Sequence, residues 1–289
     1  EKSGGSIRSA DVQRISGREL DAASRTGLRC LVDRLRSLRG NVPVVVDAES
    51  QDQLTALAAA VRSLRSEKRF LFRSAASLVK ALADPGPQPL DAAALAGLRR
   101  RNGDGALLQG LVVVGSYVPL ADQQLERLLQ APGCRGLEVP VRRIARVLEG
   151  GTPDLLLADL ERELLDQLKQ VFEADATSVL YSSRGELGFA SPRQRRHFSV
   201  QLAQLMARLA AAVAPGLGYL ISKGGTTTQT LLSKGLGLTA VQLEGQLLPG
   251  LSLVRPSEGS HAGLPILTFP GNLGSADTLR DAWQRMEAG

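Results

Sequence analysis

One short stretch of this chain combines residue types that could hold a phosphate group. It begins with Gly224 and Gly225 and continues with Thr226 and Thr227, after an apolar run that ends at Ser222. Glycine lets the backbone adopt positive φ and approach a ligand closely. Threonines at a helix start add hydroxyls to free N–H groups, which favour an anion. The pattern predicts a phosphate-binding loop, and the alternative is a plain strand-to-helix turn with threonine caps.

A second glycine-containing loop lies near the end of the chain, after the apolar run 264–268. It reads FPGNLGS, in which Gly271 permits a tight backbone turn and the Asn272 amide can both donate and accept hydrogen bonds. Between the two loops, residues 245–250 read GQLLPG and predict a third turn, bounded by glycines. The three segments therefore follow one another in the second half of the chain.

Taken in chain order, GGTTT, GQLLPG and PGNLG resemble the nucleotide-binding domain of the four-carbon acid sugar kinase family. In that family the Gly-Gly-x-Thr loop and the late Gly-Asn loop enclose ATP, and an earlier serine after an apolar strand completes the pocket. The matching residue is Ser116, which follows the run LVVVG and precedes a segment containing Gln124 and Leu125. The resemblance implies that Ser116 and the two loops bind ATP with magnesium. Thr226 departs from the family, since many members have an acidic residue there.

The resemblance continues more weakly through the first hundred residues. The segments VVVDA and FRSAA look like the end of the family's acid-sugar-binding domain, which makes Asp47 and Ser74 candidate substrate-binding residues. Asp47 has an alternative role as a carboxylate that caps a helix beginning at Gln51. The family's Asp-Asp-x-x-Gly motif is absent and the chain begins with Glu1, so we expect a fragment that lacks its front portion. We assign no catalytic residue, and we expect the chain alone to bind nucleotide without transferring phosphate.

The residue types suit phosphoryl transfer, which needs positioning and charge stabilisation more than a covalent nucleophile. Walker A, dinucleotide-binding, HExxH, CxxC and GxSxG patterns are absent, and only two histidines occur. We therefore expect an ATP-dependent kinase that phosphorylates a small, four-carbon sugar acid. A non-catalytic nucleotide-binding protein of the same fold is one alternative, and a different α/β enzyme that holds a sugar phosphate is another. Lys223 could contact a phosphate or be a solvated lysine at a strand end.

Charge and composition exclude some partners. The chain has 35 Lys and Arg against 29 Asp and Glu, scattered along its length, so its formal charge of +6 does not indicate nucleic-acid binding. The densest basic cluster, at 193–197, is expected to be a solvated helix face. No apolar run reaches the ~20 residues that cross a bilayer, and Cys30 and Cys134 show no paired spacing. We expect a cytoplasmic protein with reduced thiols and no metal centre of its own, and a homo-oligomer is compatible with the sequence.

Apolar runs of strand length alternate with helical periodicity, which predicts an α/β fold of two domains with mostly parallel sheets flanked by helices. A proline-rich segment, 84–89, and the turn 102–105 mark the connection, and we place the domains at 1–104 and 105–289. Ligand loops are expected at the carboxyl ends of the strands. The predicted strands are 43–47, 69–72, 111–114, 178–181, 217–222 and 239–243, and the predicted helices are 51–64, 75–82, 122–129, 141–148, 154–172, 192–213 and 276–286.

Overall fold

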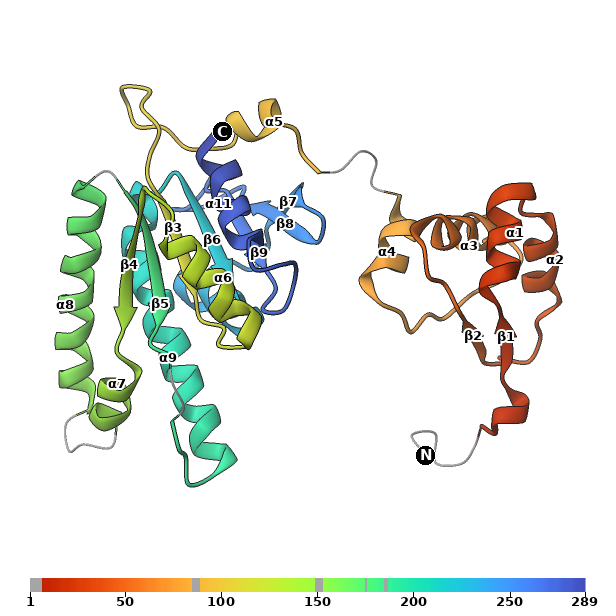
Figure 1. Cartoon of the computed structure of the whole chain (residues 1–289), viewed down its shortest axis with the longest axis horizontal. Helices are drawn as coiled ribbons and strands as arrows, with labels where there is room; N and C mark the ends of the chain where they lie inside the picture. The colour runs from red at the N-terminus through yellow and green to blue at the C-terminus, as the bar shows by residue number, and fades with distance from the viewer. Residues whose placement is uncertain (1–6, 85–88, 149–152, 175, 185–186, 289) are drawn as a thin grey trace. The chain divides into compact units, whose positions relative to one another are not determined.

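The computed structural model describes residues 7–84, 89–148, 153–174, 176–184 and 187–288 (Figure 1). The chain divides into two compact units, Glu1–Gly86 and Pro87–Gly289, and each contains parallel strands flanked by helices. The expected α/β class with two domains is therefore confirmed. Part of the proline-rich segment that was expected to connect the domains, 85–88, lies outside the described residues.

The first unit joins helices to a two-stranded parallel sheet. The sheet pairs β1 (Gln13–Ile15) with β2 (Val44–Val46) along all three residues. Ser16 and Ser50 each begin a helix with a capping box, in which the serine hydroxyl accepts from the backbone N–H three residues on. Buried leucines and alanines of these helices form one core with the sheet. The helices are α1 (Gly17–Thr26), α2 (Arg29–Ser37), α3 (Gln51–Ser63) and α4 (Ala76–Ala83), preceded by a 3-10 turn at Ser9–Asp11.

The strand expected at 69–72 is not formed. The segment pairs with no strand among the described residues, and Leu71 is fully exposed. An apolar run becomes a strand only where a neighbouring edge supplies hydrogen-bond partners. The prediction for this element is therefore wrong, although the rings of Phe70 and Phe72 stack with centroids 6.1 Å apart.

A seven-stranded sheet organises the second unit. Its strands are β3 (Gly110–Val114), β4 (Cys134–Val139), β5 (Thr177–Ser182), β6 (Tyr219–Lys223), β7 (Gln242–Leu248), β8 (Leu251–Arg255) and β9 (Ile266–Phe269). Their order is β4-β5-β3-β6-β9-β8-β7. The first five run parallel, whereas β8 is antiparallel to both of its neighbours. The parallel strands therefore end along one common edge of the sheet.

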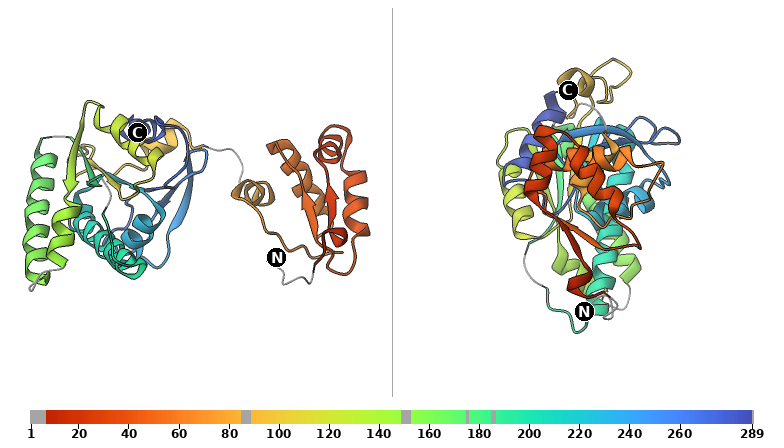
Figure 2. Two further views of the ribbon diagram at one scale, coloured as in Figure 1. Left: turned by 60° about the horizontal axis from the view of Figure 1, so that its bottom comes forward. Right: turned by 90° about the vertical axis from the view of Figure 1, so that its right-hand side faces the viewer.

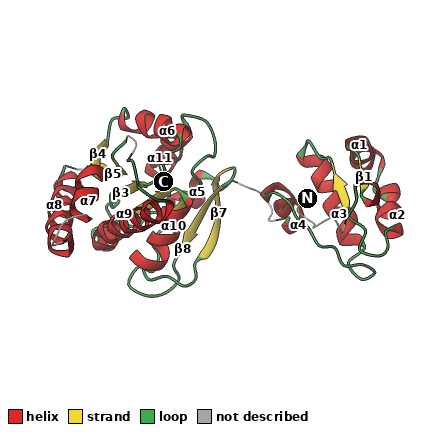
Figure 3. Cartoon of the chain, turned by 90° about the horizontal axis from the view of Figure 1, so that it is seen from below, coloured by secondary structure: helices red, strands yellow, loops and turns green. Residues whose placement is uncertain are grey.

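Helices cover both faces of this sheet (Figures 2 and 3). They are α5 (Ala92–Ala96), α6 (Pro119–Leu129), α7 (Val141–Leu148), α8 (Pro153–Glu173), α9 (Pro192–Val213), α10 (Gly225–Thr230) and α11 (Thr278–Ala288), with a π-turn at Leu231–Gly235 and a 3-10 turn at Ala214–Gly216. Leu111 and Val113 of β3 pack in one core with α7, α8 and α9, whereas Val112 and Val114 pack in another with α5, α6 and α11. A strand buried on both faces is apolar throughout, which explains the run GLVVV.

The sequence located five helices and four strands of this unit, but it missed β4, β8 and β9, and the strand predicted at 239–243 begins only at Gln242. The helix predicted at 192–213 matches α9 at both ends, and the Ser191 hydroxyl accepts from the backbone N–H of Gln194 as its cap. The glycine-bounded turn predicted at 245–250 is wrong, because residues 245–248 belong to β7 and only Pro249 and Gly250 form the turn. That turn lies beside the loop after β9, since a Cβ on Gly250 would be 3.2 Å from the Leu273 side chain.

Residues between the proline-rich segment and β3 pack with the second unit. The backbone N–H of Leu90 donates to the carbonyl oxygen of Gln246 in β7 at 2.7 Å, and α5 contributes Leu95 to the core under α6 and α11. The division into compact units therefore falls at Gly86, earlier than the boundary placed at residue 104.

A polar network joins α11 to the amino edge of the sheet. The Glu287 carboxylate accepts from the Tyr219 hydroxyl and from Thr177 Oγ1, the latter at 2.7 Å. It also pairs with the buried guanidinium of Arg99 at 2.9 Å. Trp283 Nε1 donates to Thr177 Oγ1 at 3.1 Å. The last helix is thus tied to the starts of β5 and β6, at the opposite edge from the strand ends.

The two cysteines lie in different units and are unpaired, as expected. Cys30 is exposed on α2, and Cys134 is buried at the start of β4. Burial, with a smaller effect of the Glu287 carboxylate, raises the pKa of the Cys134 thiol to about 12.

Candidate functional site

Three loops of the second unit meet at the carboxyl edge of its sheet. They follow β3, β6 and β9, which are adjacent and parallel. The ladder continues one residue past the strands, because the N–H of Gly115 donates to Lys223 O at 3.2 Å and the N–H of Gly224 donates to Phe269 O at 2.9 Å. The sheet itself therefore brings together loops that are far apart in the sequence.

The loops approach so closely that a side chain would meet a neighbouring loop at three positions. A Cβ on Gly115 would be 2.1 Å from the Thr227 hydroxyl oxygen. A Cβ on Gly224 would be 3.3 Å from the backbone nitrogen of Ser116, and one on Gly271 would be 2.9 Å from Ser116 Oγ. Ser116 thus lies between the two predicted glycine loops. The structure brings these predicted site residues together.

The two glycines of the central loop have different roles. Gly224 has φ +115°, in the region that favours glycine, whereas Gly225 has no positive φ. Gly225 is exposed, and a Cβ placed on it would meet nothing within 4 Å. Positive φ therefore accounts for the glycine at 224 but not for Gly225, which instead faces open space where a ligand could approach.

The threonines after the glycines differ in the same way. Thr227 is buried against the other loops, and Thr226 is exposed. The Thr228 hydroxyl is already bonded within the protein, 2.9 Å from Ser222 Oγ and 3.1 Å from Ser222 O. The cap residue of α10 is Gly224, without a side-chain cap. The loop is therefore a strand-to-helix turn, but no threonine side chain caps the helix.

Lys223 is neither solvated nor exposed toward a ligand, the two roles that the sequence left open. Its side chain is fully buried, and Nζ donates to the carbonyl oxygens of Pro270 at 3.2 Å and Gly271 at 3.3 Å. Nζ also lies 4.0 Å from the centroid of the Phe269 ring, a cation–π contact. Burial, and to a smaller extent the Arg184 charge, lowers the pKa of Lys223 to about 8. The buried ammonium group therefore fixes the first residues of the loop after β9 through their carbonyl oxygens.

Arg184, which follows β5, belongs to the same site and was not predicted. Its Nη1 donates to the carbonyl oxygen of Ser116 at 2.7 Å. Its Nε lies 3.2 Å from Asp122 Oδ1 on α6, an ion pair without hydrogen-bond geometry, and Nη2 is buried with no hydrogen-bond partner in the described structure. Burial lowers the pKa of Arg184, and the Asp122 carboxylate opposes that shift. No local motif marks this residue, because its role depends on neighbours from other elements.

The outer part of the loop after β9 is fixed by α6. Gln124, which is fully buried, donates through Nε2 to the carbonyl oxygens of Leu273 at 2.9 Å and Ser275 at 2.6 Å. Asn272, which lies between Gly271 and Leu273, is exposed. The predicted amide is therefore at the surface of the site.

The two candidate substrate-binding residues of the first unit, Asp47 and Ser74, make fewer contacts with other loops than the candidates of the second unit. Asp47 pairs with Arg14, and the cap of α3 is Ser50, so the helix-capping alternative for Asp47 is wrong. Arg14 is largely exposed, as expected of a weak surface pair. Ser74 is exposed and lies on the wall of an apolar groove of about 1210 Å³ within this unit, lined also by β2 and the segment 69–73.

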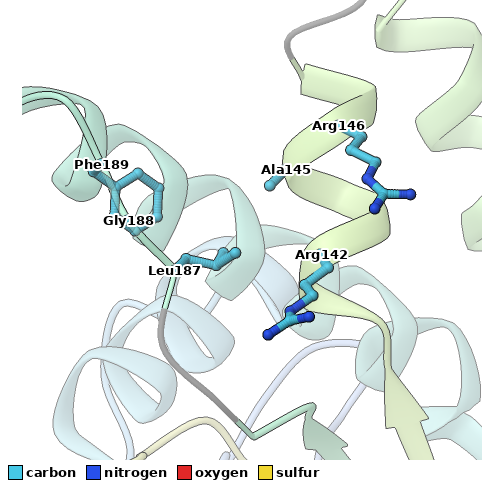
Figure 4. Close-up of a pocket in the computed structure, with 6 residues that line it drawn as sticks. All are labelled: Arg142, Ala145, Arg146, Leu187, Gly188 and Phe189. Atoms are coloured by element: carbon cyan, nitrogen blue, oxygen red, sulfur yellow. The ribbon is translucent and has the colours of Figure 1, made fainter.

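A smaller hollow of about 250 Å³ lies elsewhere in the second unit, between α7 and the segment 187–189 (Figure 4). Arg142, Ala145 and Arg146 form one wall, and none of the predicted site residues lines it. Among the described residues, no group of His, Cys, Asp and Glu has the arrangement of a metal site. In the same part of the chain, no helix combines the length and apolar character needed to cross a membrane.

Two family models match the chain. The model of a sugar-binding N-terminal domain matches residues 3–82, and the model of a nucleotide-binding C-terminal domain matches residues 111–279. The second match alone covers more than half of the chain. Among curated proteins, the comparison finds no match.

Solved structures share the fold of the chain. A Salmonella typhimurium protein, named as a proposed tRNA synthase, is 18% identical with a TM-score of 0.58 over 94% of this chain and 59% of its own. A Bordetella bronchiseptica domain of unknown function, a domain-swapped dimer with bound citrate, is 20% identical with a TM-score of 0.52 over 96% and 60%. A Haemophilus influenzae protein is 16% identical with a TM-score of 0.52 over 94% and 60%. The chain therefore spans about 60% of the length of these structures, and likeness at these identities shows the fold alone.

Proposed function

Because the chain belongs to the family of four-carbon acid sugar kinase-like proteins, in which a sugar-binding N-terminal domain is joined to a nucleotide-binding C-terminal domain, we propose that its second unit binds ATP with magnesium. The observation that carries this proposal is the meeting of the Ser116, Gly224 and Gly271 loops at the carboxyl edge of a parallel sheet. Open α/β sheets bind their ligands at this edge. Gly225 faces open space where phosphates could lie, and two cations, the buried Lys223 and the partly buried Arg184, hold the neighbouring loops.

The reaction that suits this site is transfer of the terminal phosphate of ATP to a hydroxyl of a small sugar acid. Phosphoryl transfer depends mainly on position and charge, which Ser116, the loop N–H groups and the two cations supply. Bound magnesium would neutralise charge on the phosphates. The central loop, GGTTT, carries no carboxylate, so its exposed Thr226 hydroxyl is the group that we assign to approach the ion.

The acceptor side of the proposal rests on the first unit, which matches a sugar-binding domain. We assign a four-carbon sugar acid to it, with Asp47 and Ser74 as candidate contacts. The Bordetella protein binds citrate, another small carboxylate, and forms a dimer. A small-acid substrate and a homo-oligomer are therefore part of the proposal, as is a cytoplasmic location.

The non-catalytic alternative depends on a motif that these 289 residues do not contain. The sequence contains no adjacent pair of aspartates, whereas the resemblance that led to this family includes an Asp-Asp-x-x-Gly motif. A protein that keeps the nucleotide site but lacks this motif would bind ATP without phosphorylating an acid. The alternative function is thus nucleotide binding alone.

Calorimetric titration with magnesium ATP tests the site. We expect Gly225→Val to remove most of the nucleotide affinity without unfolding the protein, because the new side chain would project into open space at the loop. Gly103→Val is the matched control, since Gly103 is also exposed, has no positive φ and has nothing within 4 Å of its Cβ position. Unchanged affinity in Gly225→Val would remove this loop from the site.

Measurement of ADP release distinguishes the two functions. The protein is incubated with ATP and a panel of acids, namely threonate, erythronate and their 2-oxo and 3-oxo forms. Turnover that depends on an acid supports the kinase. ATP binding without turnover, for the chain as given and for a version extended at its N-terminus, supports the binding protein. Absence of ATP binding would contradict both.

A further inference from the structure

Two cations, the fully buried Lys223 and the partly buried Arg184, hold the two outer loops of the proposed nucleotide site through main-chain carbonyl oxygens. Lys223 binds the carbonyls of Pro270 and Gly271, and Arg184 binds the carbonyl of Ser116. These contacts have the same form although Lys223 ends β6 and Arg184 follows β5. In both cases the positive charge lies on the protein side of a loop.

The contacts are stronger than ordinary loop contacts. Hydrogen bonds from charged donors contribute more than neutral ones, and their strength increases where water is excluded. Lys223 is fully buried, and the Arg184 side chain is only 26% exposed. Removing either charge would leave the corresponding carbonyl oxygens without their cationic donor.

The loops also depend on each other. Ser116 Oγ would be 2.9 Å from a Cβ on Gly271, so the loops held by the two cations touch at this point. A shift of either loop would change the surface on which the phosphates are proposed to lie.

We propose that Lys223 and Arg184 are positioning residues of the nucleotide site, which fix the separation of the Ser116 and Gly271 loops through their carbonyl oxygens. This inference rests on the proposed function of the second unit. Neither residue needs to touch the nucleotide, which distinguishes the role from that of a lysine in direct contact with phosphate.

The proposal makes nucleotide affinity depend on pH in a defined direction. Lys223 loses its proton as the pH rises through about 8, and its bonds to the carbonyl oxygens then weaken. The charge that faces it is Arg184, which is itself accompanied by Asp122 on α6, Glu138 on β4 and the Tyr181 hydroxyl on β5. Repulsion by Arg184 lowers the pKa of Lys223, so removal of Arg184 should move the pH midpoint upward.

The test measures magnesium ATP affinity between pH 7 and 9.5 for the whole chain and four variants. We expect the affinity of the wild type to fall several-fold across this range. Lys223→Met should bind at least about fivefold more weakly at pH 7 and show no fall with pH, whereas Lys223→Arg, which keeps the charge, should bind better than Lys223→Met and show no fall. Arg184→Met should bind weakly with its midpoint at higher pH.

Lys234→Met is the matched control, because Lys234 is an exposed lysine of the same unit, and it should behave as the wild type. A Lys223→Met variant with wild-type affinity and an unchanged pH profile would overturn the proposal. A measurement without nucleotide tests the positioning role even if the second unit does not bind ATP. Backbone hydrogen exchange at residues 271–275 should accelerate in Lys223→Met and not in Lys234→Met, even if ATP does not bind at all. Equal exchange in both variants would also overturn the proposal.

Discussion

Ser116 is the residue at which the parts of the candidate site converge. Its backbone nitrogen faces Gly224, its hydroxyl faces Gly271, and its carbonyl oxygen is bound by Arg184. The cap of α6 is Val118, so Ser116 does not cap the helix that follows it. The hydroxyl is therefore available to a ligand that enters between the loops.

Removing this hydroxyl should weaken nucleotide binding and leave the fold unchanged. We expect Ser116→Ala to lower magnesium ATP affinity several-fold, equivalent to about 1 kcal/mol for one hydrogen bond. Ser233→Ala is the control, since that hydroxyl bonds only to Gln229 O at the surface. Calorimetry and thermal unfolding together check the result. A lower melting temperature with unchanged affinity would show that Ser116 supports the fold rather than the ligand.

Lys223 should affect folding stability and ligand affinity in opposite directions as the pH rises. Its folded pKa of about 8 is below the ordinary 10.5, so between these values the unfolded chain binds more protons than the folded one. Stability therefore increases with pH across this window, by at most about 3 kcal/mol. Urea unfolding at pH 7.5, 8.5 and 9.5 measures the effect as the difference between wild type and Lys223→Met. Parallel pH curves for the two proteins would contradict it.

The sequence could identify the residues of this site only where a local pattern exists. Gly224, Gly271 and Ser116 stand in recognisable contexts of glycine, strand and turn, and the structure places them together. Lys223 also lies in such a context, but whether a lysine at a strand end is solvated or buried depends on the loop that covers it. Arg184 has no pattern at all, because its partners Ser116 and Asp122 are more than sixty residues away.

At the scale of elements, the last helix depends on one buried ion pair. The Arg99 guanidinium is 4% exposed and reaches both Glu287 and the carbonyl oxygen of Leu108. Arg99→Met would leave the Glu287 carboxylate short of a partner, and we expect it to lower the free energy of unfolding by about 2 kcal/mol, since that carboxylate is partly exposed. Arg127→Met, at an exposed site on α6, should change stability little. Denaturant unfolding of the two variants compares them directly, and equal stabilities would show that the pair is not needed.

Burial on both faces made some strands predictable, although the mostly buried β9 was not among the predicted strands. β3 is buried on both faces and reads GLVVV, so its apolar run stands out. β4 reads CRGLEV and is an edge strand with three exposed residues, so charge and glycine interrupt its pattern. The segment 69–73 shows the reverse case, in which an apolar run lacks a neighbouring strand. Local composition therefore indicates which segments can be strands, and the available edges decide which become strands.

At the scale of the whole molecule, the two units have separate cores. The core of the first unit contains residues between Ile15 and Leu82, and the cores of the second contain residues between Leu90 and Met286. We expect two calorimetric unfolding transitions, only one of which moves to higher temperature when magnesium ATP is added. At a hundredfold excess of ATP over Kd, binding should raise the free energy of unfolding of the second unit by about 2.7 kcal/mol.

A core substitution assigns the transitions. Leu57 of α3 is 2% exposed, so Leu57→Ala should lower the stability of the first unit by roughly 2–5 kcal/mol. The transition that moves in this variant should be the one that ATP leaves in place. One transition that responds to both changes would mean that the units unfold together.

The contrast between Cys30 and Cys134 gives the protein its own reporters for labelling experiments. Maleimide and related reagents need an accessible thiol, such as that of Cys30, and they attack the thiolate, which a buried thiol with a pKa of about 12 does not readily form. A dye added to the native protein should therefore attach to α2 alone and mark the first unit. Cys134 can be modified only after local unfolding exposes the start of β4. The rate at which Cys134 is labelled therefore measures how often that edge of the sheet opens.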